Sequence, residues 1–263
     1  MKKLAFAIAT ASAIGLSLYG AWDTNAATQK KSQLPAAPFA ETVQPEAVAA
    51  LRKMSAYLTT LHSFGIKTNT TLDLVTANGQ RVQMGGTAKY KVKRPDGFQI
   101  DVVTDGKDRR FFYDGKQFTM VAPKYKFYAS APAPSTIRET LDAIYDRYGI
   151  DLPLVDLFRW SDPNATPADN LTAAFHVGSA TVDDVSTDHY AFREGDKDWE
   201  VWIEKGDKPL PRKLVIVSRD DPAHPAYIAR INWDTNASFS AGDFTFKPQA
   251  DDKAIHMAAL RRP

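Results

Sequence analysis

Alternation of apolar and polar side chains with a period of two residues runs through most of this chain. It is clearest in residues 82–93, where Tyr90 and Val92 share one parity and Lys91 falls on the other. This period is typical of a half-buried β-strand. Turn signals separate successive runs, the first being Asn78-Gly79, which indicates a hairpin with a two-residue loop. The sequence therefore predicts a long antiparallel meander.

The meander is expected to contain about eleven strands in two groups. The first group is predicted near residues 64–74, 82–93, 98–102, 109–113, 116–122 and 124–129. The second group is predicted near residues 176–183, 188–194, 198–204, 212–219 and 226–235. Gly85-Gly86, in the middle of one run, indicates a bulge or bend that would add curvature to the sheet.

A helix of about 17 residues is predicted to precede the strands. It starts at Pro45-Glu46, because proline at the first helical position loses no hydrogen bond and an acid is favourable in the first turn. Apolar side chains then recur every three or four residues. They are Val48, Leu51, Met54, Leu58 and Leu61.

Two more helical segments are predicted between the groups of strands. Thr136 and Glu139 have the spacing of a capping box, and Gly149 ends the first of these helices. Its apolar stripe is Ile137, Leu141, Ile144, Tyr145 and Tyr148. The second segment follows Pro153 and is short and amphipathic. Its apolar residues are Leu154, Val155, Leu157, Phe158 and Trp160.

These elements predict a mainly β protein with some helix, of the α+β class. A long meander must cover its apolar face or close on itself, and three helices can cover it only partly. The expected fold is an unclosed barrel of about eleven strands, with an N-terminal helix and a helical lid across its mouth. It would occupy residues 45–250 as a single domain, and residues 251–263 would be a loosely held tail. A solid core without a cavity is the alternative.

The N-terminal residues resemble a secretory signal. Lys2 and Lys3 precede an apolar run that extends to about Tyr19, and small residues at 24–27 offer a cleavage site. An uncleaved membrane anchor is the competing interpretation, but the run is short for a span of ~20 residues. We therefore expect a cleaved signal peptide at 1–27, a mobile segment at 28–44 and a periplasmic mature protein.

Composition excludes several classes of site. The chain has no cysteine, so disulfides, thiolate metal sites and cysteine nucleophiles are excluded. A net charge of +2 argues against a nucleic-acid binder that relies on phosphate attraction. The five histidines lack the spacing of a helical metal site, and no glycine-rich phosphate loop or nucleophile elbow occurs. We expect no catalytic residue, metal or cofactor.

Three stretches resemble the LolA-like lipoprotein-carrier superfamily. They are VKRPDGFQIDVVTDGKDRRFFYDG at residues 92–115, AVAALRKMSAYLTTLHSFGIKTN at 47–69, and AGDFTFKPQADDKAIHM at 241–257. The resemblance is nearest to members of that group that are uncharacterised predicted periplasmic proteins. It implies an eleven-stranded unclosed barrel with a helical lid, an apolar interior and ligands such as lipoprotein acyl chains. It implies no catalysis.

Arg94 has two interpretations. It falls on the apolar parity just before Pro95, where a strand-end arginine can lay its stem on apolar surface and extend its charge to water. In the carriers that the chain resembles, the arginine of the Lys-Arg-Pro motif lies inside and hydrogen-bonds to the lid. The resemblance therefore implies that Arg94 is a gate that an entering acyl chain would release.

The remaining candidate ligand residues are apolar and share an inward-facing parity. They are Met84, Tyr90, Val92, Phe98, Ile100, Met120 and Trp199, and the candidate lid residues are Ile137, Leu141, Ile144, Tyr145, Tyr148, Leu154 and Phe158. Packing in a solid core is the alternative role for these side chains. Trp199 and Trp202 lie on opposite faces of one strand, so we expect one to be interior and the other exposed.

The leading hypothesis is a carrier or binding protein for a hydrophobic ligand, namely a lipid, an acyl chain or a lipidated protein. We expect a monomer that could meet a membrane-bound donor or acceptor. The alternative is an interaction module that senses a lipidated or unfolded protein and regulates an envelope complex. A third hypothesis is an enzyme that acts on a hydrophobic small molecule.

Overall fold

The computed structural model describes residues 42–160 and 168–260. The predicted signal peptide at 1–27 lies outside the described residues. Of the predicted mobile segment at 28–44, only residues 42–44 fall within them.

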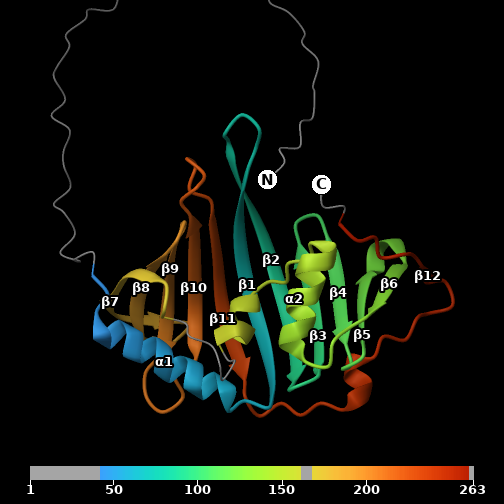
Figure 1. Cartoon of the computed structure of the whole chain (residues 1–263), viewed down its shortest axis with the longest axis horizontal. Helices are drawn as coiled ribbons and strands as arrows, with labels where there is room; N and C mark the ends of the chain where they lie inside the picture. The colour runs from blue at the N-terminus through green and yellow to red at the C-terminus, as the bar shows by residue number, and fades with distance from the viewer. Residues whose placement is uncertain (1–41, 161–167, 261–263) are drawn as a thin grey trace, which may run out of the picture. The chain divides into compact units, whose positions relative to one another are not determined.

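Within the described residues, twelve strands form one sheet that does not close, in the order β12-β6-β5-β4-β3-β2-β1-β11-β10-β9-β8-β7 (Figure 1). The strands are β1 (Ser63–Val75), β2 (Arg81–Lys93), β3 (Gly97–Thr104), β4 (Asp108–Tyr113), β5 (Gln117–Ala122), β6 (Phe127–Pro132), β7 (Leu171–Val182), β8 (Val185–Glu194), β9 (Lys197–Glu204), β10 (Pro211–Ser218), β11 (Ala226–Asp234) and β12 (Lys253–Ala254). The predicted α+β class and the unclosed, eleven-stranded antiparallel barrel are confirmed. β12 is an additional two-residue strand, and it pairs in parallel with β6.

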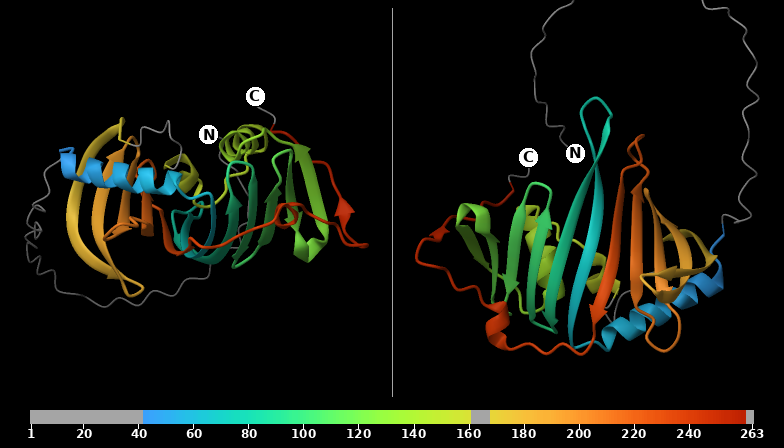
Figure 2. Two further views of the ribbon diagram at one scale, coloured as in Figure 1. Left: turned by 90° about the horizontal axis from the view of Figure 1, so that it is seen from below. Right: turned by 180° about the vertical axis from the view of Figure 1, so that it is seen from behind.

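Helix α1 (Pro45–Thr59) begins at the predicted proline and has Glu46 in its first turn. Figure 2 shows that it lies across the concave side of the half of the sheet that contains β7 to β11. Its buried face contacts the sheet through an apolar stripe with the predicted spacing. The buried residues are Ala47, Leu51, Met54, Ser55 and Leu58.

Helices α2 (Ile137–Tyr148) and α3 (Val155–Trp160) follow β6 and lie on the same concave side (Figure 2). The Thr136 hydroxyl oxygen accepts a hydrogen bond from the Glu139 backbone N–H (3.2 Å), as the capping-box spacing predicts. Gly149 ends α2 with φ of 66°, a left-handed conformation that glycine adopts without steric cost. We call residues 137–160, which comprise both helices and their linker, the lid.

Two glycine predictions need correction. The Thr76 N–H donates to the Gln80 carbonyl, so the loop of the β1–β2 hairpin is residues 77–79 and not the predicted two residues. Gly79 takes the left-handed conformation in this loop, with φ of 82°. Gly85-Gly86 makes no bulge, since the β1–β2 register is continuous there. Gly86 instead allows the Thr70 side chain to lie close to the β2 backbone, because a Cβ at this position would be 2.9 Å from Thr70 Oγ1.

The segment after residue 248 is held against the fold, so the prediction of a loose tail is wrong for its described part. Met257 is buried in the hydrophobic core, and the Leu260 N–H donates to the Arg147 carbonyl at the end of α2 (2.8 Å). β12 adds hydrogen bonds to the edge of β6. The prediction was based on the polar composition of this segment, but a few apolar residues are enough to anchor it.

Both tryptophans of β9 are buried, contrary to the prediction that one would be exposed. Trp199 is inside, and Trp202, on the outer face, is only 8% exposed. The Trp202 ring stacks on His189 with 3.8 Å between ring centroids, and Lys213 Nζ lies 4.0 Å from its centroid. Neighbouring side chains, rather than the barrel interior, cover this ring.

Candidate functional site

The register of the sheet brings most of the predicted ligand residues into one row across its concave face. Each residue of this row is the cross-strand partner of the next. The row, which we call the first concave row, is Trp233, Ile66, Tyr90, Ile100, Phe111, Met120 and Ala129. Val92 and Phe98 are paired beside it. Five predicted ligand residues are therefore neighbours.

Two more of the predicted ligand residues, Met84 and Trp199, belong to a different row. This second concave row is Phe192, Trp199, Ile216, Tyr227, Leu72 and Met84, and again each residue is the cross-strand partner of the next. Along β1 it lies six residues from the first row, a distance of about 20 Å at the usual rise per residue. Met84 and Trp199 therefore do not lie with the other predicted ligand residues.

Hydrogen bonds to three backbone carbonyls join the lid, and the residues just before it, to the sheet and its β2–β3 turn. The Tyr90 hydroxyl donates to the carbonyl of Pro153 in the α2–α3 linker (2.9 Å). The Tyr113 hydroxyl donates to the Pro134 carbonyl just before α2 (2.6 Å). The Ile137 N–H at the start of α2 donates to the Pro95 carbonyl (2.9 Å). Burial raises the pKa of both tyrosines, so both hydroxyls stay protonated donors.

An aromatic stack joins the far end of the lid to the second row. Trp160 of α3 stacks on Trp199 with 5.4 Å between ring centroids, and Phe192 stacks on Trp199 at 4.1 Å. The Ser55 hydroxyl of α1 donates to the Trp160 carbonyl. The lid thus contacts both concave rows and the N-terminal helix.

Most predicted lid residues face the sheet. Ile137, Leu141, Ile144, Leu154 and Phe158 are buried, and Tyr148 is half-buried. Tyr145 is 54% exposed, so the prediction that it belongs to the apolar stripe is wrong. At 100° per residue it lies roughly 70° around the helix from the centre of that stripe.

Arg94 is half-buried at the end of β2. Its backbone N–H donates to the His62 carbonyl (2.8 Å), and its guanidinium carbon lies 5.6 Å from the centroid of the Phe64 ring. The neighbouring Pro95 carbonyl accepts a hydrogen bond from the N–H of Ile137, the first residue of α2. The turn therefore meets the lid through backbone, while the predicted side-chain gate stays a prediction.

Tyr227 is a member of the second row that the sequence analysis did not single out. Its hydroxyl oxygen is buried and has no hydrogen-bond partner in the described part of the chain. Burial raises its pKa well above the usual range, and the carboxylates of Asp156 and Asp151 in the lid raise it further. The alternation of Tyr227, Ala229 and Ile231 in β11 was the available signal, since it gives Tyr227 the inward parity.

Four of the five neighbouring predicted ligand residues are buried. Tyr90, Val92, Phe98 and Ile100 are at most 2% exposed. They belong to one hydrophobic cluster with the buried residues of α2 and α3. In the described structure, therefore, side chains of the lid and the sheet pack directly against each other at these positions.

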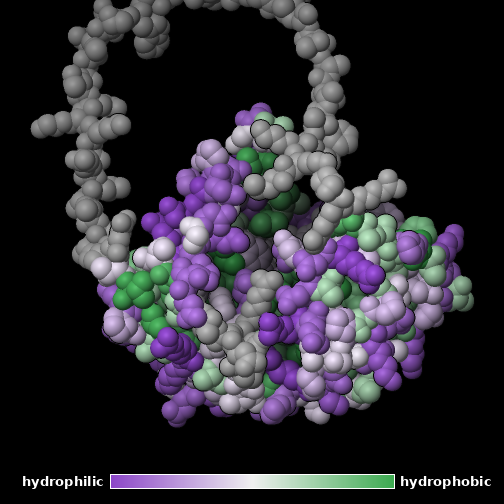
Figure 3. All heavy atoms as spheres, in the orientation of Figure 1, coloured by the Kyte–Doolittle hydropathy of each residue, from purple (hydrophilic) through white to green (hydrophobic). Residues whose placement is uncertain are grey.

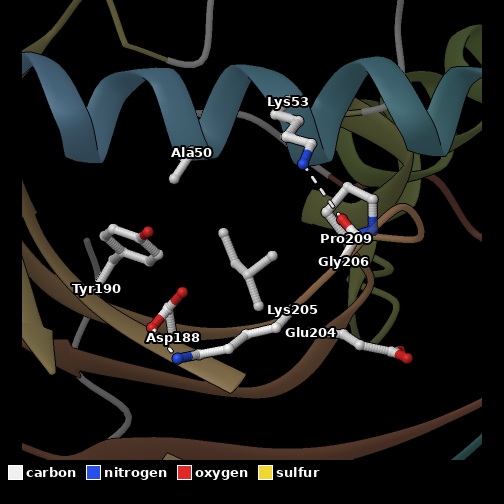
Figure 4. A pocket seen from close by; sticks show the side chains of 9 residues that line it. Ala50, Lys53, Asp188, Tyr190, Glu204, Lys205, Gly206 and Pro209 are labelled. Atoms are coloured by element: carbon white, nitrogen blue, oxygen red, sulfur yellow. Dashed lines mark hydrogen bonds and ion pairs between the residues drawn. The ribbon is translucent and has the colours of Figure 1, made fainter. Parts of the chain in front are cut away.

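A pocket of about 210 Å³ lies between α1 and the β8–β9 part of the sheet (Figure 4). Its lining includes Asp188, Tyr190 and Lys205. Lys205 Nζ lies 3.1 Å from Asp188 Oδ1. Burial opposes the charge on Asp188, but hydrogen bonds from Lys205 and Ser179 outweigh it and hold the pKa of Asp188 below its usual value. This pocket contains none of the predicted ligand residues.

Metal and membrane features were sought among the described residues. Residues 42–160 and 168–260 contain no cluster of three or more His, Asp or Glu side chains suited to a metal ion. In the same part of the chain, no helix combines the length and apolar character that a membrane crossing requires.

Comparison with protein families gives one match. The model of the family described as "Predicted periplasmic protein (DUF2092)" matches residues 47–258. Its description confirms the predicted periplasmic location. None of the curated proteins matches the sequence.

Solved structures with a similar chain trace include three of interest. Lipoprotein LppX of Mycobacterium tuberculosis is 14% identical with a TM-score of 0.46, covering 74% of this chain and 98% of that chain. An uncharacterised conserved protein of Thermus thermophilus is 9% identical with a TM-score of 0.45, covering 80% and 99%. A LolA superfamily protein of Nitrosomonas europaea is 9% identical with a TM-score of 0.31, covering 76% and 97%.

Proposed function

This chain belongs to the family of predicted periplasmic proteins (DUF2092), and from that premise we propose that it binds a hydrophobic ligand between the lid and the concave face of its sheet. The ligand class is a lipid, an acyl chain or a lipidated protein. The protein acts as a monomeric carrier or binding protein and performs no catalysis. A membrane-bound donor or acceptor would load or unload it.

The nature of the attachment between lid and sheet carries this proposal. The surface beneath the lid is formed by large apolar and aromatic side chains, and the hydrogen bonds described above attach the lid region to the sheet through backbone carbonyls. If the lid lifts, it exposes apolar surface that an acyl chain can cover again. Each methylene buried there contributes ~0.8 kcal/mol, so a long chain can offset the apolar burial that the lid gives up when it lifts.

Specific residues have roles in this proposal. The ligand contacts the concave face, and the apolar side of the lid closes over it. The contact residues are Met84, Tyr90, Val92, Phe98, Ile100, Met120 and Trp199. The closing residues are Ile137, Leu141, Ile144, Tyr148, Leu154 and Phe158. Arg94 acts as the gate at the turn that receives α2.

Native mass spectrometry of the mature protein tests the proposal. We expect protein purified from the periplasm under mild conditions to carry lipid, and lipid-free protein to bind a fluorescent fatty acid or its ester. Protein that arrives lipid-free and also binds neither probe would refute a hydrophobic-ligand function.

The role of Arg94 has its own test. We expect Arg94→Leu to keep the fold, judged by circular dichroism, but to change how long a bound fluorescent lipid is retained. Lys93→Leu is the matched control, because Lys93 is exposed and has the opposite parity on β2. Equal retention in wild type, Arg94→Leu and Lys93→Leu would mean that Arg94 is only the end of a strand.

A further inference from the structure

The second concave row continues beyond the lid onto a projecting hairpin. β11 pairs with β1 only as far as Leu72, and β3 pairs with β2 only from Gly86 onward. Beyond these points β1 and β2 are strand partners only of each other, with Gly85 and Asp73 still hydrogen-bonded to Asp105 and Ala226 beside them. Figure 1 shows this hairpin rising above the neighbouring strands. Its concave side is therefore open to solvent.

That concave side is apolar. Leu72 is 43% exposed, and the cross-strand pair Leu74 and Val82 are 47% and 39% exposed. In Figure 3, hydrophobic surface at the top of the view continues into the hollow below the hairpin. Contiguous exposed apolar surface on a soluble protein commonly marks a binding site. The second row thus forms an apolar track from solvent at Leu72 to the stacked rings of Trp199 and Trp160.

A hydrogen-bond donor lies within this track. Tyr227 is the cross-strand partner of both Leu72 and Ile216. Its hydroxyl is buried and has no partner among the described residues. The hydroxyls of Tyr90 and Tyr113, by contrast, both donate to backbone carbonyls, one in the lid and one just before it. An unsatisfied buried hydroxyl is costly, so its presence indicates an acceptor that arrives with a ligand.

The negative charges near Tyr227 limit which kind of acceptor a ligand can bring there. Asp151 and Asp156 are near enough to disfavour negative charge at the hydroxyl. The same two carboxylates would repel the carboxylate of a free fatty acid. An ester carbonyl accepts a hydrogen bond without carrying charge. The chemistry of the track therefore suits an uncharged acyl ester.

We infer that the second concave row is the path by which a neutral lipid ester, of the diacylglycerol type, enters the protein, with the Tyr227 hydroxyl donating a hydrogen bond to an ester carbonyl. This inference rests on the proposed function and adds the route, the anchoring residue and the class of lipid. The acyl chains lie along Leu72, Ile216 and Trp199. Trp160 unstacks from Trp199 while the ester enters and stacks again once the ester is bound.

A competition assay on the mature, lipid-free protein tests the class of ligand. A fluorescent fatty acid and its methyl ester are the probes, and dioctanoylglycerol is the unlabelled competitor. We expect the ester to bind more tightly than the acid at neutral pH, and dioctanoylglycerol to displace it. A diacylated lipopeptide that displaces the probe better than dioctanoylglycerol would overturn the assignment to a free lipid.

The anchor is tested with Tyr227→Phe against Tyr128→Phe, since Tyr128 lies on β6, away from the second row. We expect Tyr227→Phe to weaken ester binding about two- to tenfold, the effect of one neutral hydrogen bond, and to leave fatty-acid binding unchanged. It should raise the Tm of lipid-free protein, because it removes an unpaired buried hydroxyl, and lower the Tm of ester-loaded protein. Tyr128→Phe should show no such reversal.

The route is tested with Leu72→Ser and Val82→Ser against Val103→Ser. Val103 is also exposed, at 54%, but it alternates with Ile100 along β3 and so lies on the face opposite the concave rows. We expect slower ester association for the first two variants and wild-type association for Val103→Ser. Binding of acid and ester with equal affinity, unaffected by Tyr227→Phe, would overturn the inference while leaving the proposed function intact. Failure to bind either probe would instead refute the proposed function.

Discussion

Trp160 of the lid and Trp199 of β9 stack with their ring planes 27° apart. This contact joins the end of α3 to the sheet by ring packing rather than by a side-chain hydrogen bond. Separating the two rings breaks their packing and the hydrogen bond that the Ser55 hydroxyl donates to the Trp160 carbonyl. The lid can open at this end only when both contacts are broken.

We expect Trp160→Leu to release a bound fluorescent acyl ester faster than wild type does. The lost stacking is worth about 1 kcal/mol beyond the area buried, so the release rate should rise about fivefold. Stopped-flow dilution into excess unlabelled ester measures the rate. Trp202→Leu, on the outer face, should lower the Tm without changing release. Similar acceleration in both variants would attribute the effect to general destabilisation.

Tyr90→Phe should loosen the linker between α2 and α3. The change removes the hydrogen bond to the Pro153 carbonyl, which contributes about 1 kcal/mol. Amide hydrogens of residues 152–160 should then exchange about fivefold faster in hydrogen-exchange mass spectrometry. Exchange in β8 and β9 should be unchanged. Uniform acceleration across the sheet would show that Tyr90 supports the whole core and not the lid in particular.

Gly97→Ala should dislodge the short helix η2 (Ala241–Phe244) from β3. A Cβ at Gly97 would lie 2.7 Å from the Phe244 ring, so the ring must move. We expect a loss of about 1–3 kcal/mol in the free energy of unfolding, and faster proteolysis after residue 240. Gly106→Ala is the control, because no atom lies within 4 Å of the Cβ position there. Equal losses for the two variants would contradict the steric account.

Asp243 should make stability depend on acidic pH. The hydrogen bond from Lys91 Nζ (2.8 Å) and those from the Ser240 backbone N–H and hydroxyl lower the pKa of Asp243 from 3.8 to about 2. A lowered folded-state pKa contributes stability that is complete above the unfolded value and is lost as pH falls through the folded value.

The measurement is the Tm of wild type and Asp243→Asn across the acidic range. The difference between them should be largest above about pH 4, should shrink as the pH falls and should disappear below about pH 2. Asp207→Asn, at an exposed turn, is the control and should track wild type throughout. A difference that persists unchanged at the lowest pH would exclude the carboxylate charge as its cause.

Local periodicity in the sequence predicted most of the fold. Alternation located eleven strands, and the spacing of Thr136, Glu139 and Gly149 located α2 and its ends. Each of these signals acts over a few residues, so it can be read without knowledge of the tertiary structure. The C-terminal anchors and the covering of Trp202 depend on residues distant in sequence, and local patterns did not reveal them.

The candidate site was predicted less completely, for a related reason. Parity correctly placed Tyr90, Phe98 and Ile100 on the concave face. It could not show that Met84 and Trp199 belong to a second row, because a row depends on the register of six strands. Tyr227 had the right parity, but its significance comes from a missing hydrogen-bond partner, which only the packed structure reveals.

An unclosed sheet has two edges, and here each is covered by a segment from one end of the chain. Residues 253–255 bond to β6, while residues 42–44 bond to Ala174 of β7. Exposed edges are templates on which further strands add. The chain ends thus act as terminators of sheet growth. Removing either segment would expose β6 or β7 as an edge on which another strand can add.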